Sequence, residues 1–411
     1  MRRKPSILFV HDAFPGQFGD FARWLAGEGW EVSFATAAPG AAPGAAAPGL
    51  RVLRYAPHRA PSPATHPYAQ AMDRAALAAQ GFARAALAAR AAGLRPDLVV
   101  SHAGPGAGLF AGEVFPGAAT VPYCEWWYRF PGADVAFLAG IEPAAAARGP
   151  EAAIHERARN APIALELAGA AAALCPTAFQ AAQFPEAFAA RLTVLHDGID
   201  TARFRPDPAA RRATLGGRVA PGARVVSYAT RGMEPHRGFP QLMAALPAVL
   251  AADPGAVAVI AGENRVAYGG DGLRRIDWKA RALAAHDLDP ARVIFTGTLP
   301  PADYLALLRR SDAHVYLTVP FVLSWSLLEA MGAGCALVAS DTAPVREFVS
   351  GDEAALVDFR DPGRLAEAIL ATLAGGPEVA RRRAAARARV EAEAAQARLF
   401  PAKARFLAGV A

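Results

Sequence analysis

The sequence predicts an α/β protein of two doubly wound, Rossmann-like domains that face a cleft. Short apolar runs alternate along the chain with longer amphipathic stretches rich in Ala and Leu, a pattern typical of βα units around a parallel sheet. The same alternation begins again in the second half of the chain. The length of 411 residues and the 53% of hydrophobic residues are enough for two buried cores.

In the first half, strands are expected at the short apolar runs, residues 7–10, 31–36, 97–101 and 121–125. Helices are expected between or after them, one ending near Gly29 and two others at residues 68–92 and 150–170. In the second half, strands are expected at residues 224–229, 256–261, 293–296, 314–317 and 336–339. A helix is expected at residues 239–252.

The domain boundary is expected between the two halves. Residues 196–200 form a turn-rich stretch, and Pro206 and Pro208 follow it. We therefore expect a first domain at residues 1–197, a second at 198–385 and a C-terminal helix at 386–411. The apolar residues of that last helix are expected to pack back on the first domain, with contact to a membrane surface as the alternative.

Charge and cysteine content favour a cytoplasmic protein with small anionic ligands. The net charge of +6 is too diffuse to indicate nucleic acid binding. The three cysteines lie far apart and give neither a disulfide framework nor a zinc spacing. The apolar run at residues 7–10 is too short for a signal peptide, and no run of about 18 apolar residues occurs. Weak contact with the inner face of the membrane stays open.

A dinucleotide-binding enzyme is one alternative for this fold class. The first predicted strand is followed by residues 15–19 (PGQFG), whose glycine spacing differs from G-x-G-x-x-G. A Walker lysine loop is also absent from the sequence. Both observations disfavour a nicotinamide-dependent dehydrogenase.

The most informative motif is residues 324–341 (SWSLLEAMGAGCALVASD), which predicts a helix start, a short helix, a Gly-rich turn and a buried strand. A helix N-terminus offers free N–H groups and a positive dipole end, which suit an anion or sugar hydroxyls. The motif resembles the donor-binding signature of family 4 glycosyltransferases. That resemblance implies a GT-B fold and transfer of a sugar from a nucleotide sugar with retention of configuration.

Further segments extend the resemblance over most of the chain. Residues 230–239 (TRGMEPHRGF) resemble the strand-end Arg and Lys-Gly of the family, with Arg237 as the second cation. Residues 194–200 (VLHDGID) resemble its linker, and 295–297 (FTG) its base-side strand. Residues 96–102 (PDLVVSH) match the family's motif PD-x-x-x-x-H, which places His102 at the position of the family's N-domain histidine near the reacting sugar.

The chain departs from the family at one position. Eight residues before Glu329 the family has a second Glu beside the donor sugar, and this chain has Phe321. The usual Gly-rich span between the two positions is Val322-Leu323-Ser324-Trp325-Ser326 here. Phe321 is therefore left out of the predicted catalytic residues.

The resemblance implies roles for particular residues. Arg231 and Arg237 would stabilise the leaving diphosphate, Glu329 would accept hydrogen bonds from the donor ribose, and His102 would contact the transferred sugar from the other domain. His102, Arg231 and Arg237 are thus the predicted catalytic residues. The predicted donor-binding residues are Gly16, Arg231, Arg237, Gly297, Thr298, Ser324, Trp325, Ser326 and Glu329.

Each of these residues also has a plain structural interpretation. Residues 326–329 match a capping box, in which the Glu reaches back to the helix start. Arg231 and Arg237 could be solvated cations, and His102 could be a satisfied histidine at a strand end. Gly16 could be a turn residue, although such a turn also lets the backbone approach a phosphate.

An aromatic cluster at residues 123–129 (YCEWWYR) carries one carboxylate and one guanidinium. Flat rings with polar neighbours suit sugar contact, although part of the cluster is expected to be core packing. The predicted acceptor-side residues are Glu125, Trp127, Tyr128 and Arg129. Residues 287–289 (DLD) superficially resemble a metal-binding motif, but they follow a predicted helix and precede a proline, so we interpret them as a helix-end turn. No catalytic metal is predicted.

The sequence therefore predicts a retaining, metal-independent glycosyltransferase that uses a UDP- or GDP-linked sugar and no cofactor. The acceptor would be a saccharide, a lipid-linked compound or a small molecule, and nucleic acid is not an expected partner. The alternative, motivated by Phe321, is a catalytically silent sugar-nucleotide-binding protein or a GT-B-type epimerase.

Overall fold

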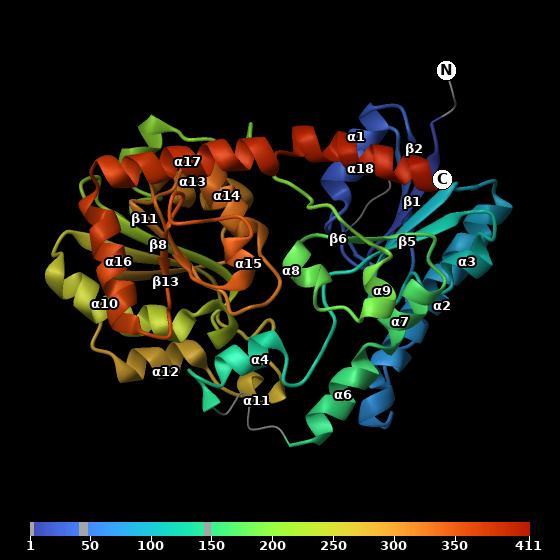
Figure 1. The fold of residues 1–411 in the computed structure, drawn as a ribbon, viewed down its shortest axis with the longest axis horizontal. Coiled ribbons are helices and arrows are strands. Elements are labelled where there is room, and N and C mark those ends of the chain that lie inside the picture. The colour runs from blue at the N-terminus through green and yellow to red at the C-terminus, as the bar shows by residue number, and fades with distance from the viewer. Residues whose placement is uncertain (1–3, 41–47, 144–148) are drawn as a thin grey trace. The chain divides into compact units, whose positions relative to one another are not determined.

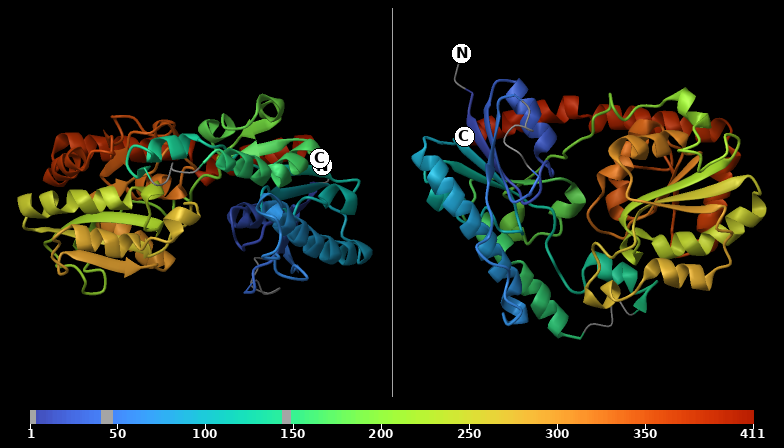
Figure 2. Two further views of the ribbon diagram at one scale, coloured as in Figure 1. Left: turned by 90° about the horizontal axis from the view of Figure 1, so that it is seen from below. Right: turned by 180° about the vertical axis from the view of Figure 1, so that it is seen from behind.

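The computed structural model describes residues 4–40, 48–143 and 149–411, and it contains two parallel β-sheets flanked by helices (Figures 1 and 2). The chain divides into two compact units. The first comprises Met1–Phe130, Pro150–Asp197 and Ala397–Ala411, and the second comprises Pro131–Gly149 and Gly198–Gln396. The predicted α/β class with two doubly wound domains is confirmed.

The sheet of the first unit has the strand order β3-β2-β1-β4-β5-β6-β7. Its strands are β1 (Ser6–Val10), β2 (Glu31–Thr36), β3 (Leu50–Arg54), β4 (Leu98–His102), β5 (Ala119–Tyr123), β6 (Ala173–Cys175) and β7 (Leu192–Val194). Its helices are α1 (Gly19–Gly27), α2 (Gln70–Ala91), α3 (Ala111–Val114), α6 (Glu151–Arg159), α7 (Ala161–Ala168), α8 (Ala178–Ala181), α9 (Glu186–Ala189) and α18 (Gln396–Val410), with the 3₁₀ turn η1 (Pro67–Ala69).

Both faces of the central strands β1 and β4 are buried, as their apolar sequences predict. Successive side chains of β1 point to opposite faces. Phe9 packs in one cluster with Phe21 of α1 and Phe400 of α18, whereas Leu8 packs with Phe82 of α2. Helices therefore cover the sheet on both sides.

The C-terminal segment is two helices, where the sequence analysis expects one from residue 386. Helix α17 (Pro377–Glu393) belongs to the second unit, and α18 packs within the first. Lys403 of α18 forms a buried ion pair of 2.7 Å with Asp197, and that carboxylate also accepts a 2.5 Å hydrogen bond from the Tyr123 hydroxyl. Because the lone pairs of Asp197 are shared by two donors, this buried charge is well compensated.

The expected first domain, residues 1–197, is wrong in one segment. Pro131–Gly149 belongs to the second unit. Within it, helix α4 (Ala133–Leu138) inserts the fully buried Leu138 into the core around Met233 and Phe239. Local apolar pattern identifies a buried face but does not tell which core will bury it. The helix expected at 150–170 is also divided, into α6 and α7.

The sheet of the second unit has the order β10-β9-β8-β11-β12-β13. Its strands are β8 (Arg224–Gly232), β9 (Ala256–Glu263), β10 (Val293–Gly297), β11 (Ala313–Tyr316), β12 (Leu337–Ser340) and β13 (Ala355–Val357). Its further helices are α10 (Phe239–Ala252), α11 (Asp271–Arg274), α12 (Trp278–Ala285), α13 (Pro301–Arg310), α14 (Trp325–Ala333), α15 (Ala343–Arg346) and α16 (Pro362–Ala374), with the 3₁₀ turns η2 (Pro208–Arg212) and η3 (Pro235–Arg237).

The strands β3, β6, β7 and β13 were not predicted, because β6, β7 and β13 have only three residues each and β3 is partly exposed. The strands β8 to β12 lie where the sequence analysis expects them, within a few residues. In a parallel sheet, all the loops at the carboxyl ends meet at one edge, which is where ligands bind in such folds. No helix within the described residues is long and apolar enough to cross a lipid bilayer.

Candidate functional site

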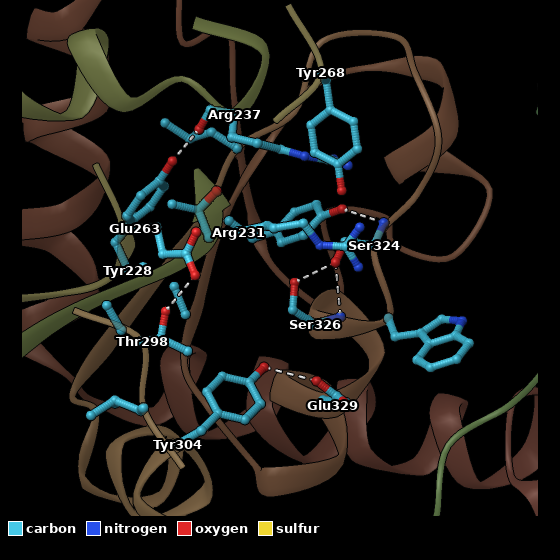
Figure 3. A pocket seen from close by; sticks show the side chains of 18 residues that line it. Tyr228, Arg231, Arg237, Glu263, Tyr268, Thr298, Tyr304, Ser324, Ser326 and Glu329 are labelled. Atoms are coloured by element: carbon cyan, nitrogen blue, oxygen red, sulfur yellow. Dashed lines mark hydrogen bonds between the residues drawn. The ribbon is translucent and has the colours of Figure 1, made fainter. Parts of the chain in front are cut away.

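A cavity of about 330 Å³ lies in the second unit, at the carboxyl ends of β8, β9, β10 and β11 (Figure 3). Helix α14 points its first residues at this cavity, so free N–H groups and the positive helix end face it. Most of the predicted donor-binding residues line it. Those residues are Arg231, Arg237, Thr298, Ser324, Trp325, Ser326 and Glu329.

Two predicted donor-binding glycines lie outside this lining. Gly297 ends β10 with a φ of +69°, and its neighbour Thr298 enters the cavity instead. Gly16 belongs to the first unit and has a φ of +51°. A Cβ on Gly16 would come within 2.9 Å of His11 Nδ1, so the turn needs glycine for packing as well as for its backbone angle.

Arg231 lies at the end of β8 with an exposed side chain. Within the described residues its guanidinium has no hydrogen-bond or ion-pair partner, and it lines the cavity. An unpaired cation at a cavity wall is available to an anion without first breaking a protein contact.

Arg237 is different, because its side chain is buried with 5% of its surface exposed. Its Nη1 donates to Thr318 Oγ1 at 2.7 Å and its Nη2 donates to the Val322 carbonyl at 3.1 Å. The guanidinium also lies 4.7 Å from the centroid of the Tyr268 ring. The interpretation of Arg237 as a solvated cation is therefore wrong, and its charge is held rigidly against the cavity.

Tyr268 and Glu234 were missed by the sequence analysis. Glu234 is fully buried, and its carboxylate accepts hydrogen bonds of 2.9–3.1 Å from the backbone N–H groups of Ala267, Tyr268 and Gly269. These bonds fix the loop that brings Tyr268 to the cavity beside Arg237. The pairing joins residues more than thirty positions apart, which no local pattern reveals.

The start of α14 corrects the capping-box interpretation. Ser324 is the N-cap, and its Oγ accepts from the Ser326 N–H at 3.3 Å and from the Ser326 hydroxyl at 2.9 Å. Glu329 accepts a 2.9 Å hydrogen bond from the Tyr304 hydroxyl instead of reaching back to the helix start. Burial raises the pKa of the Glu329 carboxyl, and the bond from Tyr304 partly opposes this. Glu329 and Tyr304 thus form a polar pair in the cavity wall (Figure 3).

Phe321, the residue that departs from the family pattern, lies in the loop between β11 and α14. Its ring centroid is 5.4 Å from that of Tyr268 and 6.0 Å from that of His236, both in edge-on contact. The Arg237 guanidinium lies 6.0 Å from the same ring. Phe321 therefore packs against Tyr268 and Arg237, which line the cavity.

In the first unit, His102 ends β4 with 15% of its side chain exposed. Its Nε2 lies 3.3 Å from Glu125 Oε2 and 3.4 Å from Gln17 Nε2. Burial alone would lower the pKa of His102, but the hydrogen bond and charge of Glu125, with smaller contributions from Glu166 and Asp12, raise it above its usual value. His102 is thus a paired, charge-prone histidine, unlike a neutral core histidine.

Glu166 of α7 is a second acidic group near this histidine that the sequence analysis missed. It accepts a 2.7 Å hydrogen bond from the Ser101 hydroxyl. Burial raises the pKa of Glu166 to about 7, while Ser101 and the charge of His102 act in the opposite direction. A carboxyl group so deeply buried is partly protonated near neutral pH.

The predicted acceptor-side residues divide into different kinds. Trp127 packs its ring within 5.7 Å of Phe184, so it contributes to the core. The guanidinium of Arg159 lies 3.6 Å from the centre of the Tyr128 ring, and Arg129 is exposed. Glu125 belongs with His102 and not with these rings. The cluster is therefore mainly packing, as the sequence analysis allows.

The described residues contain no group of three or more His, Cys, Asp or Glu side chains placed to hold a metal ion. In the Asp287–Asp289 stretch, Asp289 Oδ1 accepts from the Ala291 N–H at 2.8 Å. This local bond fits a turn after α12.

Two family models match the chain, and together they span most of it. The model of the glycosyl transferase family 4 group matches residues 28–204, and that of the glycosyl transferases group 1 matches residues 223–375. The chain belongs to the family 4 glycosyltransferases. Its fold is the GT-B fold of that family.

Two curated relatives agree with this assignment. Over 206 residues the chain is 33% identical to a glycogen synthase of Mycobacterium tuberculosis, covering 50% of this chain and 45% of the relative. Over 207 residues it is 34% identical to a GDP-mannose-dependent alpha-(1-6)-phosphatidylinositol monomannoside mannosyltransferase of the same organism, covering 47% and 50%. The match thus spans about half the length of these curated relatives.

Two solved structures cover almost the whole chain. A sucrose-phosphate synthase from Thermosynechococcus elongatus superposes with a TM-score of 0.74 at 17% identity, covering 98% of each chain. Anabaena HepE in complex with UDP-glucose superposes with a TM-score of 0.68 at 17% identity, covering 98% of this chain and 100% of that one. At such identities these likenesses concern the fold.

Proposed function

We propose that this glycosyltransferase transfers a sugar from a nucleoside diphosphate sugar to an acceptor, with retention of configuration and without a catalytic metal. The observation that carries the proposal is the cavity of the second unit, where Arg231, Arg237 and the N-terminus of α14 converge. When the glycosidic bond of the donor breaks, negative charge grows on the diphosphate. Fixed cations and helix N–H groups stabilise such charge.

The polar groups of the same cavity support a nucleotide sugar as the ligand. Glu329 and Tyr304 form one hydrogen-bonding pair, and Thr298 and Glu263 form another at 3.2 Å. Both pairs offer acceptors to ribose or base hydroxyl and amino groups. Tyr268 and Trp325 add aromatic faces suited to a sugar or a base.

The names of two similar proteins support UDP and GDP as candidate nucleotides of the donor. The mannosyltransferase relative is GDP-mannose-dependent, and HepE was solved with UDP, with UDP-glucose, and with UDP and glucose. We therefore propose a UDP- or GDP-linked hexose as the donor. The acceptor is proposed only as a saccharide, a lipid-linked compound or a small molecule.

A thermal-shift screen across nucleotide sugars and free nucleotides tests donor binding. A ligand at about 100 times its dissociation constant stabilises the folded protein by about 2.7 kcal/mol, which raises the unfolding temperature measurably. The binding donor is then incubated with and without saccharide and lipid extracts, and release of the nucleoside diphosphate is measured. Binding of no nucleotide sugar would contradict the proposal.

A catalytically silent nucleotide-sugar-binding protein or an epimerase is the second candidate. Phe321 favours it, because an aromatic ring occupies the position where the family has a carboxylate beside the donor sugar. This candidate predicts donor binding with neither transfer nor hydrolysis, or interconversion of the free donor. Product analysis of the same incubations separates these outcomes.

We predict that transfer persists in excess chelator. Arg231 and Arg237 supply the positive charge that metal-dependent transferases obtain from an ion. The measurement is the transfer rate after extensive treatment with EDTA, compared with the rate after Mg²⁺ or Mn²⁺ is added back. A complete loss that either ion restores would contradict metal independence.

We predict that His102→Ala lowers turnover at least about tenfold and leaves the affinity for the nucleoside diphosphate nearly unchanged. His102 belongs to the first unit, whereas the cavity with the two arginines lies in the second. Its proposed contact is with the transferred sugar, so the loss appears in kcat. Calorimetry with the free diphosphate and steady-state kinetics provide the two values. Normal turnover in this variant would remove His102 from the proposed reaction.

A further inference from the structure

A hydrogen-bonded cluster in the first unit joins the ends of three neighbouring strands. His11 follows β1, His102 ends β4 and Glu125 follows β5 by two residues. Gln17, in the loop between β1 and α1, bonds to His11 and Glu125, and its Nε2 lies 3.4 Å from His102 Nε2. The sequence analysis named His102 and Glu125 separately, and neither family resemblance nor local pattern connects them with His11 or Gln17.

The directions of these hydrogen bonds follow from their donors. The Ala13 N–H can only donate, so His11 Nδ1 accepts at 2.9 Å. Burial and the nearby His102 lower the pKa of His11 to about 4, so His11 is neutral and carries its proton on Nε2. That Nε2 therefore donates to Gln17 Oε1 at 2.6 Å. The amide orientation of Gln17 is thereby fixed.

With its oxygen occupied, Gln17 presents its amide NH₂ to Glu125. Gln17 Nε2 donates to Glu125 Oε1 at 2.6 Å, whereas its distance to His102 Nε2 is 3.4 Å. The other carboxylate oxygen, Oε2, lies 3.3 Å from His102 Nε2. Each oxygen of Glu125 is therefore directed at one neighbour, and the carboxylate cannot turn away from His102 without losing the bond from Gln17.

His102 depends on this cluster for its orientation. Within the described part of the chain its Nδ1 is buried without a hydrogen-bond partner. Its polar contacts are thus all on the Nε2 edge, with Glu125 and Gln17. When that edge is released, no hydrogen bond within the described residues fixes the ring, which then keeps only packing contacts such as those with Tyr123 and His11.

We propose that Glu125 and Gln17 are positioning residues for His102, which hold its ring with Nε2 directed at Glu125 Oε2. The proposal rests on the proposed function, because His102 is there the group that contacts the transferred sugar. It reassigns Glu125 from acceptor contact to orientation of His102. It also gives a role to Gln17 and, through Gln17, to His11.

Several charged groups face His102, and together they favour its protonated form. Glu125 contributes most, and Glu166 on α7 and Asp12 after β1 contribute less. His11 lies with its ring centroid 4.8 Å from that of His102 and would oppose the charge if protonated. Because His11 is neutral at neutral pH, the carboxylates prevail. The sign is therefore definite: removing the charge of Glu125 must move the protonation midpoint of His102 to lower pH.

The test is the variant Glu125→Gln, which keeps the shape of the side chain and removes its charge. We expect the midpoint of His102, followed by NMR of its ring protons, to fall by at least about one pH unit. The high-pH limb of the kcat profile is expected to move by the same amount, with the affinity for free UDP or GDP unchanged. Glu113→Gln is the matched control, because Glu113 is an exposed carboxylate of the same unit.

A second variant, Gln17→Met, keeps the length of the side chain and removes both of its hydrogen bonds. It is expected to lower kcat at least about tenfold, and it also serves if Glu125→Gln does not fold. An unmoved His102 midpoint in Glu125→Gln, or a lowered midpoint with an unmoved kcat profile, would overturn the proposal. The NMR midpoint needs no turnover, so an inactive wild-type protein with a shifting midpoint would refute the proposed function and leave the pairing of His102 with Glu125 supported.

Discussion

Arg231→Ala is expected to lower the rate of sugar transfer by about 10²–10³ with the folded protein almost as stable as the wild type. Removing one fixed group that stabilises developing negative charge commonly costs this much in rate. Stability should change little, because the exposed guanidinium has no partner within the described residues. Calorimetry with UDP and GDP should show weaker binding of the diphosphate in the same variant.

The neighbouring Arg237 is expected to behave differently. Arg237→Ala would also weaken diphosphate binding, but it removes the bonds to Thr318 and Val322 and the contact with Tyr268. Hydrogen bonds to a charged group contribute about 1.5–3 kcal/mol to stability. Only the Arg231 variant is therefore expected to change diphosphate binding without changing stability. For the Arg237 variant, an unfolding curve must be measured beside the kinetics.

Arg218→Ala is the matched control for Arg231, since it removes an exposed arginine from the same unit away from the cavity. It should leave both transfer and diphosphate affinity at the wild-type level. Unaltered diphosphate affinity in both the Arg231 and Arg237 variants would exclude these arginines from the donor site.

The sequence was sufficient to predict several donor-side residues that lie at or after the ends of strands. Arg231 at the end of β8 and Ser324 at the start of α14 were predicted at the donor side from the resemblance to family 4 glycosyltransferases, and both line one cavity. Their positions follow from the rule that the carboxyl ends of parallel strands share an edge. This rule needs only the strand positions, which the apolar runs give.

The residues that were missed act through contacts between distant parts of the chain. Glu234 binds the loop at residues 267–269, Tyr304 binds Glu329, and Gln17 links His11 to Glu125. None of these pairs repeats with a helix or strand period, so periodicity does not reveal them. The capping-box interpretation failed for the same reason, because a local spacing was preferred over the distant Tyr304.

The sequence analysis assigned residues 131–149 to the wrong domain, and the reason is energetic. Leu138 and Phe137 of α4 are apolar, and either core would bury them favourably. In the structure, the ring centroid of Phe137 lies 5.2 Å from that of Phe359 in the second unit. The apolar pattern of a sequence predicts that a side chain is buried. Which residues bury it depends on the whole fold.

Phe321→Glu is expected to destabilise the second unit by several kcal/mol. The substitution removes the ring contacts with Tyr268 and His236 and puts a carboxylate among them. The Arg237 guanidinium lies 6.0 Å from the Phe321 ring, but its Nη1 and Nη2 already donate to Thr318 and Val322. The gain from that cation is therefore smaller than the cost of burying the new charge.

The measurement is chemical unfolding of the variant beside Phe321→Leu, a control that keeps the site apolar. The Leu variant should lose less stability, because it leaves only a partly filled space. If the Glu variant is destabilised and Phe321→Leu retains transfer, the site needs an apolar side chain at position 321 and does not need the carboxylate that the family has there. A well-folded Phe321→Glu with faster transfer than the wild type would show the opposite, namely that the chain lost a sugar contact that a single carboxylate can restore.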